Sequence, residues 1–288
     1  MIPARGLDHL VLAVKDLEAA RDFYARLGFT LTPRARHPFG TDNSLAQLRG
    51  CFLELLSVTR PAEIPPHGPD HFSFAAYNRD FLVRRQGFSM LVFESRDARA
   101  DRDEFRAKGL RTYAPFDFSR QARLPDGAEV TVGFSLTFMS DPRMPDCPMF
   151  VCQQHAPEHF WKPDYQRHAN GAVGIEAVYL VAADPQALAG HFAALQGPVS
   201  VAATPEGIEV VTARGRVRVL EPAAFAARFP GARIPNAPTT PYYAGFRLAL
   251  AEPGRVPAAF SGIELRAGAG SRWIDPAQAF GCLIEFVS

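Results

Sequence analysis

A short pattern of predicted strands and helices recurs along this chain and constrains its fold more than any other feature. The first copy opens with the apolar strand LDHLVLAV at residues 7–14. A helix follows in KDLEAARDFYARLGF, where Asp16 is suited to the N-cap and Gly28 ends the helix. Further short strands end with CFLELLSV at residues 51–58, so the unit has the order β-α-β-β-β.

Three later segments begin the same pattern again. GFSMLVFES at residues 87–95 opens a second unit, which closes with MFVCQQH at residues 149–155. GIEAVYLVA at residues 174–182 opens a third, and a shorter fourth copy runs from Tyr243 to the final GCLIEFVS. Because a repeated unit defines the architecture of a chain, the sequence predicts an α+β fold built from tandem βαβββ units.

One such unit leaves an open sheet edge and an exposed apolar face, so we expect the units to pair into curved mixed sheets that form cups. Pairing divides the chain into a first domain at residues 1–155 and a second, degenerate domain at residues 173–288. The connection at residues 156–172 is too aromatic for a flexible linker, and we expect it to pack onto a domain surface. A second long connection, at residues 59–84, is rich in Pro and aromatic residues.

The composition excludes several classes of partner. The formal net charge is +1, so no global field recruits nucleic acid or an anionic membrane. No window approaches the ~20 apolar residues that cross a bilayer, and no secretory signal is recognisable. The four cysteines show no CxxC spacing, which is typical of free thiols in a reducing compartment. We therefore expect a cytoplasmic protein that takes a small-molecule ligand; a homodimer is one assembly compatible with this.

Two polar residues interrupt apolar strands at matched positions. Alternation along a strand places His9 on the face of Val11, and it places Glu54 on the face of Phe52 and Leu56. A buried carboxylate without a partner is costly, and an imidazole or a metal ion opposite it would compensate. A hydrogen-bonded pair of His9 and Glu54 satisfies the same pattern, so both interpretations stay open.

LDHLVLAV, the helix ending FYARLGF and CFLELLSV together resemble the vicinal oxygen chelate superfamily, which includes glyoxalase I, extradiol dioxygenases and bleomycin-resistance proteins. The stretches HPFGTDNSLAQLRGCFLELLSV and FVCQQHAPEHFWKPDYQRHANGA are similar, more narrowly, to glyoxalase-like domain proteins. The resemblance implies two domains of the vicinal oxygen chelate type and a divalent metal ion such as Zn, Mn, Ni or Fe. It also implies ligands from the first and last strands of a unit, where this sequence has His9 and Glu54.

The other units do not complete such a site. Met90 and Cys152 occupy the equivalent positions of the second unit, and Gly245 and Glu285 those of the fourth. One His and one Glu are fewer ligands than glyoxalase I or an extradiol dioxygenase uses, so both activities are disfavoured. We expect the second domain to be a structural lid without a metal, and Glu285 to be a solvated or salt-bridged residue at a sheet edge.

Residues outside this pair are further candidates. His37 lies in the turn-rich HPFGTDN and is a candidate third ligand or general acid/base, and Asn43 is a candidate substrate contact. Turn chemistry alone also explains both residues. Gln154 shares the strand face of Cys152 and is a second candidate substrate contact.

Two functions therefore stay open. The first is a metal-assisted lyase, isomerase or oxygenase that acts on a small oxygenated substrate in the cup of the first domain. The second is a metal-free protein that binds or sequesters an apolar molecule, as the bleomycin-resistance relatives do. The 23 phenylalanines favour the second function.

Overall fold

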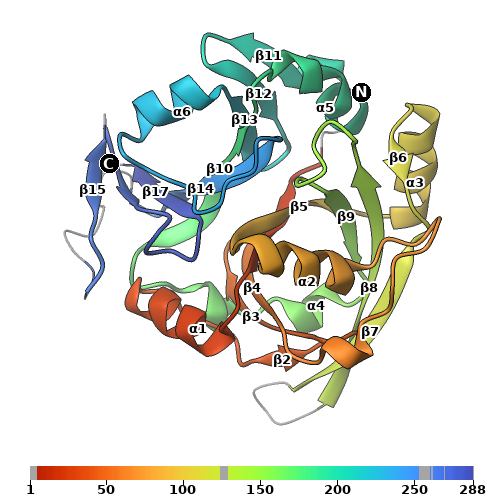
Figure 1. The fold of residues 1–288 in the computed structure, drawn as a ribbon. Coiled ribbons are helices and arrows are strands. Elements are labelled where there is room, and N and C mark those ends of the chain that lie inside the picture. Colours follow the sequence, from red (N-terminus) through yellow and green to blue (C-terminus); the bar gives the residue numbers. More distant parts are fainter. Residues whose placement is uncertain (1–4, 124–128, 253–259, 261, 269, 288) are drawn as a thin grey trace.

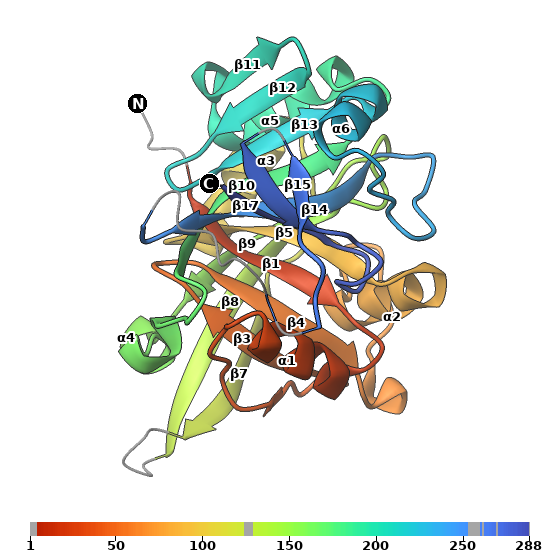
Figure 2. The same ribbon diagram turned by 90° about the vertical axis from the view of Figure 1, so that its left-hand side faces the viewer.

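The computed structural model describes residues 5–123, 129–252, 260, 262–268 and 270–287. These residues form two curved sheets, each with helices packed against it (Figures 1 and 2). The first sheet has nine strands and the second has eight. The predicted α+β fold of tandem βαβββ units is confirmed.

The first sheet is built from two units whose opening strands lie side by side. Its order is β2-β3-β4-β1-β5-β9-β8-β6, with β7 paired to β8. Since β1 and β5 pair antiparallel at its centre, the two halves curl toward each other and enclose a cup. The strands are β1 (Leu7–Ala13), β2 (Ala35–Arg36), β3 (Thr41–Gln47), β4 (Phe52–Val58), β5 (Gly87–Ser95), β6 (Arg111–Thr112), β7 (Phe116–Arg123), β8 (Glu129–Ser140) and β9 (Met149–Gln154).

Three longer helices accompany this sheet. Helix α1 (Leu17–Arg26) begins at the predicted cap, because the Asp16 side chain accepts a hydrogen bond from the backbone N–H of Ala19. Helix α3 (Ala98–Ala107) is the equivalent helix of the second unit. Helix α2 (Phe74–Arg84) lies within the long connection predicted at residues 59–84, whose composition does not indicate a helix. It follows the short 3₁₀ helix η1 (Pro61–Glu63) and lies over the cup (Figure 1).

The second sheet repeats the arrangement. Its order is β11-β12-β13-β10-β14-β17-β16-β15, and β10 and β14 pair antiparallel at its centre. Its strands are β10 (Ala172–Val181), β11 (Val201–Thr204), β12 (Gly207–Val211), β13 (Arg216–Leu220), β14 (Tyr242–Leu250), β15 (Arg266–Gly268), β16 (Ser271–Ile274) and β17 (Leu283–Val287). The remaining helices are α4 (Pro157–Phe160), η2 (Pro163–Gln166), η3 (Gln186–Leu188), α5 (Ala189–Gln196), η4 (Pro198–Ser200) and α6 (Pro222–Arg228).

The two domains share one apolar core, because a single cluster of buried side chains contains residues of both sheets. At its centre the ring of Phe88 in β5 stacks on Tyr243 in β14, with ring centroids 4.4 Å apart. The backbones also approach closely: a Cβ on Gly281 would lie 2.3 Å from the carbonyl oxygen of Gln86. The sheet that forms the cup therefore packs directly against the second domain.

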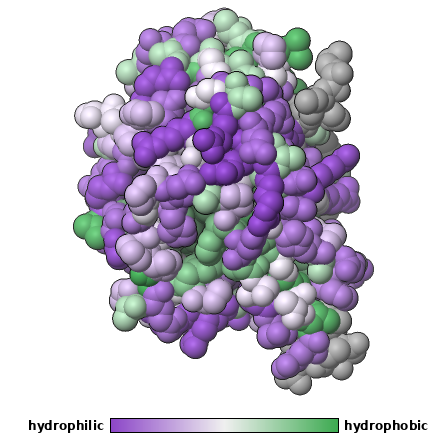
Figure 3. Space-filling model, turned by 90° about the vertical axis from the view of Figure 1, so that its right-hand side faces the viewer, coloured by the Kyte–Doolittle hydropathy of each residue, from purple (hydrophilic) through white to green (hydrophobic). Residues whose placement is uncertain are grey.

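Hydrophilic side chains cover most of the face in Figure 3, and hydrophobic ones gather in a hollow in its lower half. In the described part of the chain, the exposed large hydrophobic side chains are Val83, Val199 and Val211. No helix in that part is long and apolar enough to span a membrane.

Candidate functional site

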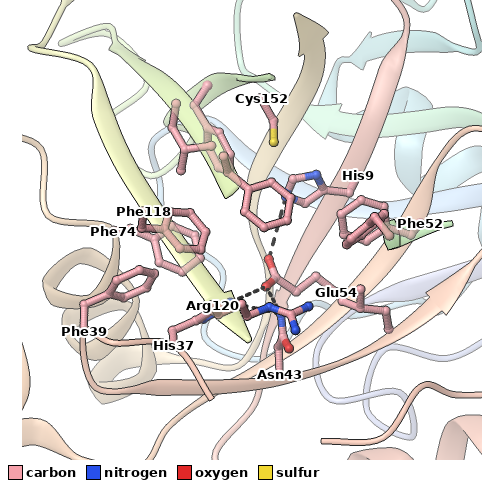
Figure 4. Close-up of a pocket in the computed structure, with 15 residues that line it drawn as sticks. His9, His37, Phe39, Asn43, Phe52, Glu54, Phe74, Phe118, Arg120 and Cys152 are labelled. Atoms are coloured by element: carbon pink, nitrogen blue, oxygen red, sulfur yellow. Dashed lines mark hydrogen bonds and ion pairs between the residues drawn. The ribbon is translucent and has the colours of Figure 1, made fainter. Parts of the chain in front are cut away.

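A pocket lies inside the curl of the first sheet (Figure 4). It is narrow, with about 50 Å³ open to water-sized molecules. Seven of its fifteen lining residues are phenylalanines, contributed by strands, by α2, by α4 and by the turn between β2 and β3: Phe39, Phe52, Phe74, Phe118, Phe134, Phe150 and Phe160. Two leucines and six more reactive or polar residues complete the wall: Leu45, Leu136, His9, His37, Asn43, Glu54, Arg120 and Cys152. Few polar groups thus face a largely apolar space.

His9 and Glu54 lie on adjacent parallel strands, β1 and β4, and point toward each other (Figure 4). Atom Nε2 of His9 is 3.7 Å from Oε2 of Glu54, and both side chains are buried. The His9 ring stacks on Phe52 with centroids 4.2 Å apart and meets the edge of Phe150. Packing against these rings fixes the orientation of the imidazole.

Asp8 is a site residue that sequence reasoning did not identify. Leu7 pairs with Phe93 and His9 pairs with Val92, so Asp8 is an extra residue that forms a β-bulge in β1. Strict alternation would place Asp8 and His9 on opposite faces, whereas the bulge brings Oδ1 of Asp8 to 2.5 Å from Nδ1 of His9. The only sequence signal is an acidic residue beside a histidine in an apolar strand.

Gln154, a predicted substrate contact, is not among the residues that line the pocket. Its side-chain amide instead donates a hydrogen bond to Oδ2 of Asp8 at 3.3 Å. In this position Gln154 supports the carboxylate that orients His9.

Asn43 connects Glu54 with His37. Strand β3 begins at Thr41, so Asn43 lies in a strand and not in the turn that the sequence indicated. Its amide donates a hydrogen bond of 2.6 Å to Oε1 of Glu54 and one of 3.2 Å to Nε2 of His37. Burial raises the pKa of Glu54, and the imidazole of His9 and the hydrogen bond from Asn43 oppose that rise.

His37 lies directly after β2, and its ring is buried in the pocket wall. Nδ1 is 2.9 Å from the hydroxyl of Thr41, and Nε2 is 3.9 Å from Oε1 of Glu54. Burial lowers the pKa of His37 to about 3, and the charge of Arg120 acts in the same direction. His37 is therefore a neutral imidazole at physiological pH.

Arg120, on β7, is a second site residue that sequence reasoning did not identify. Its guanidinium makes no hydrogen bond or ion pair with the residues that the structure describes. Burial lowers the pKa of Arg120, and the carboxylate of Glu54 opposes this. Cys152 also lines the pocket, and burial raises the pKa of its thiol well above the usual value, which favours the neutral thiol there.

A divalent metal ion, which the resemblance implies, needs about three protein donors with positions left open for substrate. Among the described residues, no group of three or more His, Cys, Asp or Glu side chains is arranged to hold one. Asp8 bonds Nδ1 of His9, and the amide of Asn43 occupies Oε1 of Glu54, so only Nε2 of His9 and Oε2 of Glu54 are left free among these donors. The donors around Glu54 do not fit a resident divalent ion.

A cluster of buried side chains packs against the second sheet. Glu285 was expected at a sheet edge, but β17 lies between β14 and β16, and the carboxylate is fully buried. The expectation of a salt bridge was right, because Arg247 donates to Glu285 at 2.8 Å and Arg228 at 3.2 Å. The hydroxyl of Tyr179 donates to the same carboxylate. The buried charge of Glu285 is thus compensated by the charges of Arg247 and Arg228.

Comparison with known proteins places the fold. The family model described as "Glyoxalase-like domain" matches residues 7–196. No curated protein matches the chain. The crystal structure of a hypothetical protein from Staphylococcus aureus superposes with a TM-score of 0.68 at 14% identity, covering 98% of both chains. A variant of 4-hydroxymandelate synthase from Streptomyces coelicolor superposes with a TM-score of 0.55 at 13% identity, over 99% of this chain and 93% of that one.

A smaller similarity involves methylmalonyl-CoA epimerase from Mycobacterium tuberculosis. The TM-score is 0.37 at 18% identity, and the match covers 53% of this chain and 91% of that one.

Proposed function

This chain belongs to the glyoxalase-like domain family, and from that premise we propose that its first domain transfers a proton at a carbon atom beside the carbonyl group of a small oxygenated substrate. The reaction class is an isomerisation or a lyase reaction. One observation supports this most: a buried carboxylate, Glu54, faces the Asp8-oriented imidazole of His9 across 3.7 Å in an otherwise apolar pocket.

Two facing groups suit this chemistry because one removes a proton and the other returns one. The carboxylate of Glu54 takes a proton from carbon, and the electron pair moves onto the carbonyl oxygen. With Nδ1 of His9 bonded to Asp8, its Nε2 faces the substrate and exchanges a proton there. Return of a proton to carbon then gives an isomer, or the departure of a neighbouring group completes a lyase reaction.

The environment of the pair favours such a transfer. A raised pKa makes the ionised carboxylate of Glu54 a stronger base than an exposed one. The surrounding phenylalanine rings leave little room for water, so electrostatic interactions with the pair are stronger than in bulk water.

Proton exchange with solvent tests the proposal without knowledge of the natural substrate. The protein is incubated in D₂O with 2-oxobutanoate, dihydroxyacetone phosphate and their uncharged analogues, and deuterium at carbon is followed by NMR. We expect exchange of at least one compound, and we expect Glu54→Gln to slow it about 100-fold or more. Glu129→Gln, which changes an exposed residue of β8, is the matched control and leaves the rate unchanged.

A second candidate function is binding or sequestration of an apolar molecule, which the seven phenylalanines of the pocket favour. The same experiment separates the two functions. Compounds that bind in the pocket without any exchange would overturn the proton-transfer proposal and support sequestration.

A further inference from the structure

A second cavity lies directly outside the cup and is much larger, with about 580 Å³ of open space against about 50 Å³ inside. Four residues line both spaces, namely His37, Leu45, Arg120 and Phe160, so the groove and the cup adjoin. The groove lies between β2 and β7, with the segment from α4 to η2 beside it. A molecule whose reacting end fills the narrow cup therefore has room for a larger remainder in this groove.

The described residues that line the groove include cationic side chains and no carboxylate. Arg34, Arg36, Arg120 and Lys162 are its charged lining residues, and His159 adds an imidazole. Arg34 is already neutralised, because Asp42 accepts hydrogen bonds of 2.6 and 2.7 Å from its guanidinium. The other three are not paired with any carboxylate in the described residues, and the Lys162 ammonium contacts only a backbone carbonyl oxygen.

Arg120 is partly buried and lies at the junction of groove and cup. It has no hydrogen-bonded partner in the described residues, and Glu54 is beyond ion-pair distance. Partial burial of a guanidinium without a partner carries a cost, and an anion bound there would compensate it. The planar fork of its N–H groups matches the oxygens of a carboxylate or a phosphate.

We propose that the groove binds an oxyanion group of the substrate, so that the substrate is an organic anion with a small uncharged carbonyl end in the cup. Arg120 binds the oxyanion, and Arg36 and Lys162 add a favourable field. This inference rests on the proposed function, which places the carbonyl end of the substrate in the cup. Binding of the anion in the groove, however, does not require the reaction to occur.

The test compares two fluorescent probes that share one ring system, anionic 1-anilinonaphthalene-8-sulfonate and neutral N-phenyl-1-naphthylamine. Their dissociation constants are measured by titration of the full chain at low salt. We expect the anion to bind at least 10-fold more tightly, and we expect added salt to reduce this ratio. Arg120→Gln should bring the ratio close to one. Arg34→Gln, which removes an arginine of the same groove that Asp42 already neutralises, should leave the ratio unchanged.

Two displacement arms identify the oxyanion. Inorganic phosphate that displaces the sulfonate probe from the wild-type protein, and not from Arg120→Gln, indicates a phosphate ester; displacement by acetate alone indicates a carboxylate. Equal affinity for both probes, or a preference that survives in Arg120→Gln, would overturn the inference. If Arg120→Gln unfolds, Lys162→Gln replaces it, and the ratio should fall there to a smaller extent.

Failure of this inference and failure of the proposed function give different results. Glu54→Gln should keep the preference for the anion while it loses proton exchange. Proton exchange without any preference for the anion would remove the inference and leave the proposed function standing.

Discussion

The carboxylate of Asp8 lies 2.5 Å from Nδ1 of His9, although the two residues are neighbours in one strand. Neighbours in a regular strand point to opposite faces, so this contact depends on the bulge where β1 pairs with β5. The bulge gives His9 a fixed orientation, with Nε2 directed at Glu54. It is therefore as much a part of the candidate site as the side chains themselves.

Replacement of Asp8 by Asn tests this positioning role. Asparagine has nearly the same size and shape as aspartate, but its neutral amide replaces the carboxylate that orients His9. We expect the maximal exchange rate to fall about 100-fold, as small misplacements of catalytic groups do, with KM changed less than twofold. The pH profile of the rate should also shift. A change in KM alone would show that Asp8 does not act through His9.

Replacement of Glu54 by Gln is expected to stabilise the folded protein near neutral pH. Burial raises the pKa of Glu54, so ionisation of this carboxyl is less favourable in the folded state than in the unfolded chain. At any pH above the pKa of Glu54 in the unfolded chain, this difference lowers the free energy of unfolding. Glutamine removes that cost and still accepts a hydrogen bond from Asn43. Urea unfolding at pH 7 and at pH 4 measures the effect, which should be present at pH 7 and smaller at pH 4, because at the lower pH more of the wild-type carboxyl is protonated in both states. A loss of stability at pH 7 would contradict this explanation.

Acid should destabilise the protein through a buried histidine far from the cup. Burial lowers the pKa of His191 in α5 to about 4, although Asp141 lies 3.2 Å away. Between about pH 4 and 6.5 the unfolded chain binds a proton that the folded chain does not, so the free energy of unfolding falls as the pH is lowered. This single group contributes up to about 1.4 kcal/mol per pH unit in that window.

Urea unfolding across the same pH range checks the assignment. In His191→Gln the dependence on pH should be shallower than in the wild-type protein. If the dependence on pH is unchanged, other groups cause the acid sensitivity. His37 is one such group, because its pKa is also lowered by burial.

The contact between the domains predicts unequal effects of two glycine substitutions. Gly281 has a φ of +85°, and a Cβ added to it would lie 2.3 Å from the carbonyl oxygen of Gln86. Gly171 has a φ of +75°, and a Cβ added there would meet no atom within 4 Å. Gly171→Ala should cost roughly 1–2 kcal/mol from backbone strain alone. Gly281→Ala should cost clearly more, because the domains must also separate. Thermal unfolding measures both, and equal losses would show that the close approach is not a constraint.

Removal of divalent metal ions should leave the protein active in proton exchange. The described residues do not assemble three donors for such an ion, and the proposed transfer uses His9 and Glu54 directly. The measurement is deuterium exchange before and after dialysis against EDTA, together with the metal content of the purified protein. Loss of exchange that Zn²⁺, Mn²⁺, Ni²⁺ or Fe²⁺ restores would show that the pair acts as metal ligands.

The sequence alone determined the repeat and the faces of its strands. Apolar alternation and helical spacing are local properties, so LDHLVLAV and CFLELLSV could be assigned as strands with His9 and Glu54 on apolar faces. Both side chains do line the cup, as do His37 and Asn43. Local patterns also predicted the tandem βαβββ architecture, because each unit exposes apolar surface that only another unit covers.

Only the tertiary structure decided how the site is completed. Asp8 reaches His9 through a bulge that exists because β1 pairs with β5, a strand far along the chain. Arg120 and Phe160 enter the cup from elements whose positions depend on long-range strand pairing. The register of such pairs is set by packing over the whole sheet and not by neighbouring residues, so no local pattern in the sequence could show these contacts.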